Sequence, residues 1–155
     1  MKLSHIVLFA VAALLALPAA AQTASEMQIL AQKIKADKKL VVAANMQLTE
    51  DEAKGFWPVY EAYQKDLENI NQRLGATIRS YAAAFNQGRV SDEVAKGLIN
   101  EAIAIDEAEA KLKRSYAARL EKVIPGVKVA RYIQIENKIR AIVRYDLAEH
   151  IPLVR

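Results

Sequence analysis

The sequence has 155 residues, of which 53% are apolar and 26% charged, and this composition is typical of one folded domain rather than a disordered chain. It contains no cysteine, which excludes a disulfide scaffold, thiol nucleophiles and thiolate metal centres. The formal net charge of +4 is modest, so it does not call for nucleic acid as a partner.

The first 21 residues have the pattern of a secretory signal peptide. Lys2 precedes an unbroken apolar stretch from Ile6 to Leu17, and three alanines follow Pro18. A membrane-spanning helix needs about 20 apolar residues, so this stretch fits a cleavable leader better than an anchor. We therefore expect cleavage after Ala21, a single helical domain over residues 22–155 and a periplasmic location.

The next two segments have helical periodicity. Thr23 or Ser25 can cap a first helix that ends near Asn45, although four lysines interrupt its apolar stripe. Thr49 followed by Glu52 forms a capping box at the start of a second helix, which we expect to reach about Asn86. Its apolar seam recurs in steps of three and four residues: Phe56, Tyr60, Tyr63, Leu67, Ile70, Leu74, Ile78, Tyr81 and Phe85.

Two further helices complete the predicted fold. Gly88 suits a reversal, Ser91 can cap a third helix, and Pro125-Gly126 separates that helix from a fourth, after which Pro152 stops the chain's helical pattern. The fold class is therefore all-α: a long antiparallel helical hairpin with two shorter flanking helices, forming an elongated bundle. Two long helices with two shorter ones give a thin bundle, which cannot easily bury the apolar faces of both long helices. The sequence therefore predicts a homodimer.

Aromatic residues surround a proline early in the second helix. Pro58 removes a backbone donor and predicts a kink, with Phe56, Trp57 and Tyr60 beside it. These side chains either pin the first helix over the bend as core residues or form an exposed aromatic lip that binds clients. The residues of the second interpretation are Phe56, Trp57, Pro58 and Tyr60.

The fourth helix is the most basic part of the chain. Its cations form either a solvated face or a patch for an acidic partner or for peripheral contact with anionic lipid headgroups. The residues of this basic patch are Lys128, Arg131, Lys138, Arg140 and Arg144.

Two resemblances add to this reading. Leu48-Thr49-Glu50-Asp51-Glu52, at the start of a long helix in an exported chain, resembles the LTxxQ motif of the Spy/CpxP-like periplasmic proteins, with Glu52 in place of the glutamine. Residues 56–60, 128–138 and 151–154 resemble an uncharacterised family of exported bacterial helical proteins. The first resemblance implies a periplasmic stress protein that binds unfolded clients or a sensor partner, and the second implies only an exported helical protein.

No residue pattern predicts an enzyme. Asp146, Glu149 and His150 could present two or three ligands at one helix end, but a zinc site normally recruits three or four, so no metal or other cofactor is expected. Glu107 and Glu109 stand four residues before Lys111 and Lys113, which favours an exposed, ion-paired helix face over paired catalytic carboxylates.

We therefore predict a non-enzymatic periplasmic protein that binds protein clients, either chaperone-like or an envelope-stress adaptor. The alternative is a dedicated regulatory subunit that binds the periplasmic domain of a membrane sensor through the basic fourth helix.

Overall fold

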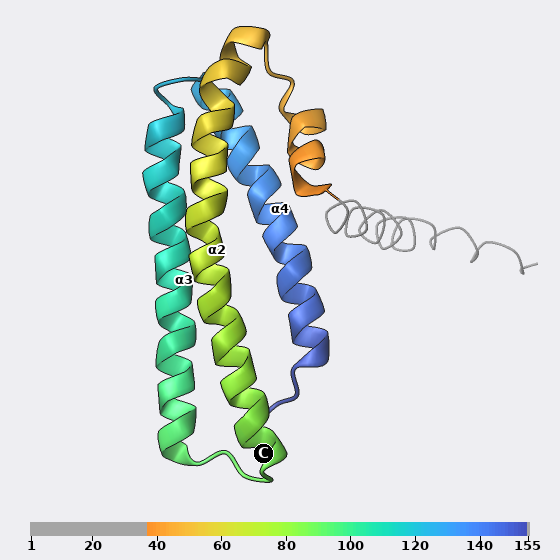
Figure 1. Cartoon of the computed structure of the whole chain (residues 1–155), viewed down its shortest axis with the longest axis vertical. Helices are drawn as coiled ribbons and strands as arrows, with labels where there is room; N and C mark the ends of the chain where they lie inside the picture. The colour runs from red at the N-terminus through yellow and green to blue at the C-terminus, as the bar shows by residue number, and fades with distance from the viewer. Residues whose placement is uncertain (1–36, 155) are drawn as a thin grey trace, which may run out of the picture. The chain divides into compact units, whose positions relative to one another are not determined.

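The protein is all-α, as the computed structural model in Figure 1 shows. The structure describes residues 37–154, and no strand occurs among them. The chain divides into a unit of residues 1–38 and a compact unit from Lys39 onward, and the account below concerns the second. The predicted signal peptide and most of the predicted first helix lie outside the described residues.

The longest helix, α2, runs from Glu50 to Asn86. Thr49 caps it as predicted: its hydroxyl accepts from the Glu52 amide at 3.3 Å, and the Glu52 carboxylate accepts from the Thr49 amide at 2.8 Å. The helix stays continuous through Pro58. Its gold first turns lean away from the axis of the longer remainder in Figure 1.

A short reversal joins α2 to α3, which runs from Asp92 to Leu120. Gly88 adopts a φ of 90° in this turn, a left-handed conformation that favours glycine. The Ser91 hydroxyl accepts from the Val94 amide at 3.3 Å and so caps α3. The two helices lie antiparallel and side by side (Figure 1), an arrangement compatible with the predicted hairpin.

The last helix, α4, runs from Gly126 to His150 and follows the hairpin back (Figure 1). We expected α3 to continue to Pro125, but it ends at Leu120 and a turn fills residues 121–124. This turn fits closely against α2. A Cβ on Gly55 would lie 2.9 Å from the Cβ of Val123, so only glycine allows this approach.

The apolar core occupies the end of the bundle where α2 begins, α3 ends and α4 begins. Helical residues 39–46 cover this end with Val42 and Met46, neither of which is exposed to solvent. The buried apolar side chains of the three long helices are Phe56, Tyr60, Tyr63, Leu67, Ile70, Ile105, Tyr116, Leu120, Val129, Tyr132 and Ile139.

Candidate functional site

The aromatic residues near Pro58 form part of this core. Phe56 is fully buried and Tyr60 is 5% exposed. The Phe56 ring meets the rings of Trp57 and Tyr132 edge to face, with centroids 5.0 Å and 5.2 Å away. Trp57 is half-buried, and the Lys39 ammonium lies 5.2 Å from its ring centroid.

This arrangement decides between the two interpretations of the aromatic residues. Phe56 and Tyr60 hold α4 and α2 together, so they are not available on the surface for a client. The prediction of a client-binding lip is therefore wrong for these two residues, and the interpretation as core applies. Pro58 is exposed and Trp57 is partly exposed, which leaves too little apolar surface there for a lip.

The first two basic residues of α4 contact the segment that enters α2. Lys128 pairs with Glu52 and also donates to the backbone carbonyl of Gln47 at 2.9 Å. Arg131 donates to Oε1 of Gln47 at 3.0 Å. Gln47 has a φ of 50°, and these two cations hold it in that left-handed conformation.

Two arginines of α4 meet a buried carboxylate on α3. Glu109 is only 4% exposed. Nε of Arg140 donates to Oε2 of Glu109 at 2.7 Å, and Nη1 of Arg140 donates to Oδ1 of Asn71 on α2 at 2.8 Å. Arg144 pairs with Asp106 and reaches Glu109 at 3.4 Å, so the group joins all three long helices.

The cations decide the protonation state of Glu109. Burial alone would raise the pKa of this carboxyl group, but the Arg140 guanidinium and the charges of two further cations lower it below its ordinary value. Glu109 is therefore ionised inside the bundle. The sequence pattern placed it on an exposed face beside Lys113, and this prediction is wrong because α4 covers that side of α3.

Most residues of the predicted basic patch therefore contact other residues of the same chain. Lys128, Arg140 and Arg144 form ion pairs, and Arg131 binds Gln47. Of these five patch residues, Lys138 alone is exposed and has no ion-pair partner within residues 37–154. Most of the cations of α4 therefore hold this helix against the hairpin.

A second polar contact lies deeper along the same interface. Nε2 of Gln64 on α2 donates to Oε1 of the buried Glu136 at 3.0 Å and to the Tyr132 hydroxyl at 3.2 Å. Burial, and then the Glu136 charge, raises the pKa of the Tyr132 hydroxyl far above its ordinary value. The hydroxyl therefore stays neutral. The contact binds α4 to α2 through side chains rather than through close backbone approach.

The opposite end of the bundle is incompletely packed. On α2 the buried seam stops at Ile70, although the same apolar spacing continues through Leu74, Ile78, Tyr81 and Phe85, all of them half-buried. These residues are aliphatic or aromatic, like those in the buried part of the seam. The difference lies in how the other two helices are placed around them.

The seams of α3 and α4 lose burial at the same level. Leu98 on α3 is half-buried and Val94 is 42% exposed, whereas the buried residues of α3, Ile105, Glu109, Tyr116 and Leu120, all lie further along the helix. On α4 the buried residues end at Ile139, and Val143, one turn later, is 37% exposed.

Two contacts cross this part of the bundle. The Arg73–Glu101 ion pair joins α2 to α3, and the Tyr81 hydroxyl donates to the Pro152 carbonyl at 2.9 Å. We call this region the open end, and its residues are Leu74, Ile78, Tyr81, Phe85, Val94, Leu98, Val143 and Leu147.

The C-terminal tail borders the open end. Pro152 is held by the Tyr81 hydroxyl, yet the next residue, Leu153, is 88% exposed and Val154 is 57% exposed. Tyr145 on the last turns of α4 is 73% exposed. The tail and the last turns of α4 therefore add exposed apolar side chains to this end of the chain, and exposed apolar surface often marks interaction sites.

Side chains that commonly bind metal ions do not gather in the described part of the chain. No group of three or more His, Cys, Asp or Glu side chains able to hold a metal ion occurs within residues 37–154. Nδ1 of His150 lies 2.7 Å from the backbone carbonyl of Asp146, which places the histidine at the carboxyl end of α4.

Comparison with protein-family models, with curated proteins and with solved structures found no match. Of the helices in the described part of the chain, none is long and apolar enough to cross a membrane.

Proposed function

We propose that this is a non-enzymatic periplasmic protein that binds protein clients at the open end of its bundle, in a chaperone-like or envelope-stress role. The observation that carries the proposal is the common level at which burial stops on α2, α3 and α4. Three apolar seams that are continuous in sequence are thereby left partly exposed together, next to the exposed tail residues Leu153 and Val154.

The open end suits recognition of unfolded segments rather than of one folded partner. Its side chains are aliphatic and aromatic, and they offer no fixed set of charges to select a sequence. Burying a leucine or isoleucine of a client contributes about 1.5–3 kcal/mol whatever the surrounding client sequence. The open end would therefore bind many different client segments, each of them weakly. The sensor-subunit alternative rested on a basic patch, and the internal ion pairs of α4 leave that patch little free charge.

Aggregation of a denatured client diluted from urea tests the proposal. We expect the protein to reduce light scattering at ratios below one copy per client. Val143→Asp should weaken this effect, because a carboxylate would face an incoming apolar segment at the open end. The matched control is Val127→Asp at the other end of α4, where Val127 is 74% exposed and an acid suits the first turn of a helix.

The two variants should fold equally well, which circular dichroism and thermal unfolding check. Two outcomes would refute the proposal: no suppression by the natural protein at severalfold excess, or equal suppression by the two variants. Trp57 lies at the core end, so its fluorescence should stay unchanged when a client binds. A large shift of the Trp57 emission would mean that the client binds at the core end and not at the open end.

Periplasmic location is tested separately. Osmotic-shock fractions should contain a shortened chain that begins at Gln22, as mass spectrometry of the intact protein would show. Recovery of the full 155-residue chain in the cytoplasmic fraction would contradict this part of the proposal and leave the binding experiment unaffected.

A further inference from the structure

The outer side of α3 carries exposed apolar residues that do not belong to the open end. Ile99 is 58% exposed and Ile103 is 53% exposed, whereas Ile105 on the inner side is 1% exposed. Positions separated by three and four residues share one face of a helix. The exposed residues that share this outer face are Asp92, Lys96, Ile99, Ile103, Glu107, Ala110 and Arg114.

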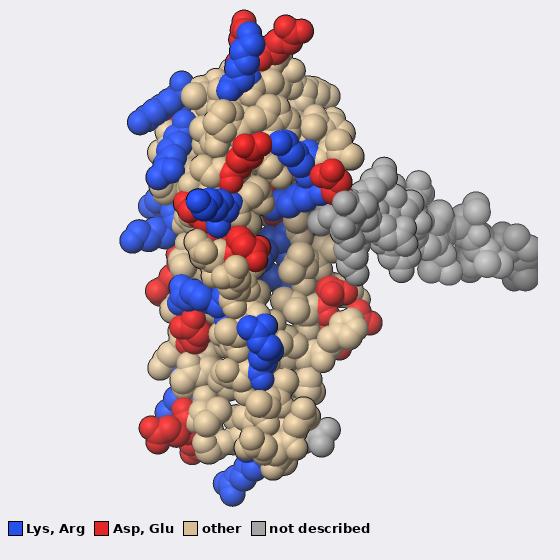
Figure 2. All heavy atoms as spheres, in the orientation of Figure 1, with Lys and Arg blue, Asp and Glu red and all other residues tan. Residues whose placement is uncertain are grey.

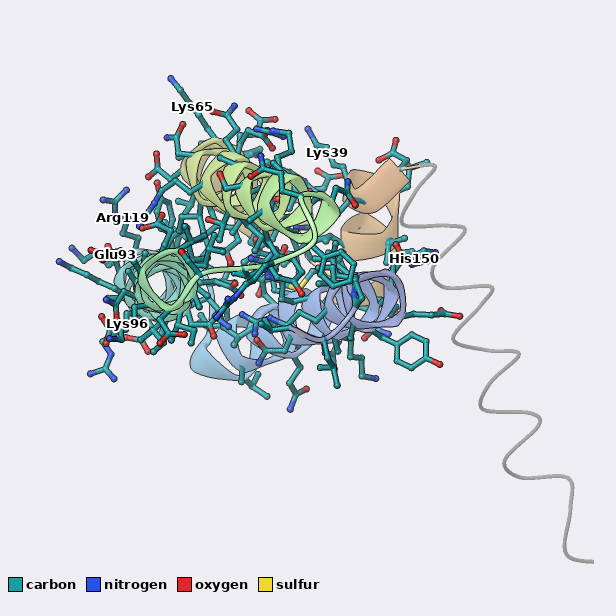
Figure 3. The ribbon with its side chains drawn as sticks, turned by 90° about the horizontal axis from the view of Figure 1, so that it is seen from below. Lys39, Lys65, Glu93, Lys96, Arg119 and His150 are labelled. Carbon is teal, nitrogen blue, oxygen red and sulfur yellow. The ribbon has the colours of Figure 1, made fainter. Side chains whose placement is uncertain are left out.

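Figure 3 shows the direction of this face. Glu93 and Lys96 point away from both α2 and α4, so neither helix of the same chain covers them. The charged residues of the face have no ion-pair partner among residues 37–154. The two isoleucines therefore form an apolar centre with unpaired charges on both sides of it.

The order of the charges along the face is the feature that identifies a partner. With Glu93 and Lys111, two exposed residues that border the face, the order from the start of α3 is acidic at Asp92 and Glu93, basic at Lys96, apolar at the isoleucines, acidic at Glu107, and basic at Lys111 and Arg114. Figure 2 shows acidic side chains gathered near the lower end of α3 and basic ones along its upper half. If a second copy of the helix runs in the opposite direction alongside, each acidic position lies opposite a basic one, and the isoleucines lie opposite each other.

We propose that a second copy of this chain packs antiparallel on the outer face of α3, with a two-fold axis between Ile99 and Ile103. Ile99 of one copy then contacts Ile103 of the other, and Lys96 lies opposite Glu107. The acidic first turn, Asp92 and Glu93, lies opposite the basic turn that holds Lys111 and Arg114. A parallel arrangement would place each charge beside its own kind, so the charge order selects the antiparallel one.

The interface is independent of client binding, because it uses the side of α3 that faces away from the other two helices. Each copy contributes only two large apolar side chains, so the dimer should be weak and should form in a concentration-dependent manner. Sedimentation equilibrium of the protein purified from cells, over a wide concentration range, should show a monomer–dimer equilibrium. A monomer at every concentration would overturn the proposal.

Charge reversal tests the pairing. Lys96→Glu should weaken the dimer by about tenfold, because each of two symmetric contacts becomes repulsive, and Glu107→Lys should do the same. The double variant K96E/E107K restores opposite charges at both contacts, so its dissociation constant should return close to that of the natural protein. Lys138→Glu on α4 is the control and should have no effect. A double variant weaker than either single variant would contradict the arrangement.

Single cysteines test the direction of packing, since the chain has none of its own. In the antiparallel dimer the two copies of position 96 lie about 15 Å apart along the axis, at 1.5 Å per residue, whereas positions 96 and 107 lie at nearly the same level. A short bismaleimide should therefore link K96C to E107C in a mixture and link neither variant to itself. Self-linking of either variant would overturn the antiparallel arrangement.

The face itself is tested by Ile103→Glu, which should abolish the dimer without loss of helix content because the side chain is 53% exposed. A dimer that survives Ile103→Glu would mean that another surface forms it, and the proposal would be wrong. Val143→Asp, the open-end variant, should leave the dimer intact, so failure of client binding and failure of dimerisation remain distinguishable.

Discussion

Removing one member of the buried Glu109–Arg140 pair should cost far more stability than replacing both. The Glu109 side chain is 5% exposed and that of Arg140 is 14% exposed, so both charges have lost most of their water. Glu109→Leu would leave the guanidinium with only the amide of Asn71, and Arg140→Met would leave the carboxylate to Lys113 and Arg144, each 3.4 Å away. Each single change should lower the free energy of unfolding by about 3 kcal/mol.

The double variant E109L/R140M should be nearly as stable as the natural protein, because two well-packed apolar side chains commonly replace a buried ion pair without loss. Urea unfolding followed by circular dichroism would give all four free energies of unfolding. The singles should together lose about 6 kcal/mol and the double should lose close to none, which is a coupling far above the 0.5 kcal/mol of independent sites. Additive losses would refute the assignment of Glu109 and Arg140 as one buried pair.

The same pair predicts how stability depends on acid. The pKa of Glu109 in the folded protein lies below its ordinary value of 4.5, so the folded state holds fewer protons than the unfolded state in acid. Its contribution is therefore fully present above about pH 4.5 and is lost as pH falls through the lowered pKa. E109L/R140M should lose less stability than the natural protein between pH 5 and the acid limit, and an unchanged pH profile would contradict the ionised state of Glu109.

Local features of the fold give further predictions. Gly55→Ala should destabilise the protein by about 1–3 kcal/mol because its Cβ would strike the turn after α3, whereas Gly97→Ala, with open space around it, should stabilise α3 by up to about 1 kcal/mol. Thr49→Ala should cost about 1 kcal/mol in thermal unfolding through loss of the α2 cap. Pro58→Ala should raise the free energy of unfolding, by up to about 3 kcal/mol in urea, because the exposed proline removes a helical hydrogen bond. Because burial raises the pKa of the Tyr132 hydroxyl, its contribution is lost as pH rises above about 10, and Tyr132→Phe should reduce that alkaline loss.

Much of the helical framework could be predicted because its signals are local. Thr49 and Ser91 cap the helices that the sequence assigns to them, and the reversal at Gly88 needs only a glycine in a short polar stretch. The α2 seam was read correctly as far as Ile70. The same spacing beyond Ile70 gave no sign that burial stops, because burial there depends on where α3 and α4 lie rather than on the α2 sequence.

The polar core could not be predicted for a related reason. Glu109 and Lys113 are four residues apart, a spacing that describes an exposed ion pair and a covered one equally well. Only the position of Arg140, which belongs to a different helix, makes Glu109 an interior residue. Phe56 and Tyr60 were open to two interpretations, since an aromatic side chain beside a bend can face either the core or solvent.

The confinement of the packed core to one end of the bundle has a consequence for how the chain opens. The first half of α2 carries the buried side chains, the last of which is Ile70, whereas from Leu74 onward no side chain of the helix is fully buried. Hydrogen exchange should therefore be graded along a single uninterrupted helix, slow in its first half and fast in its second, with local opening that does not require global unfolding. The end of the bundle that holds the Gly88 turn would then open first, while the buried aromatic side chains and the Lys128–Glu52 ion pair keep the other end closed.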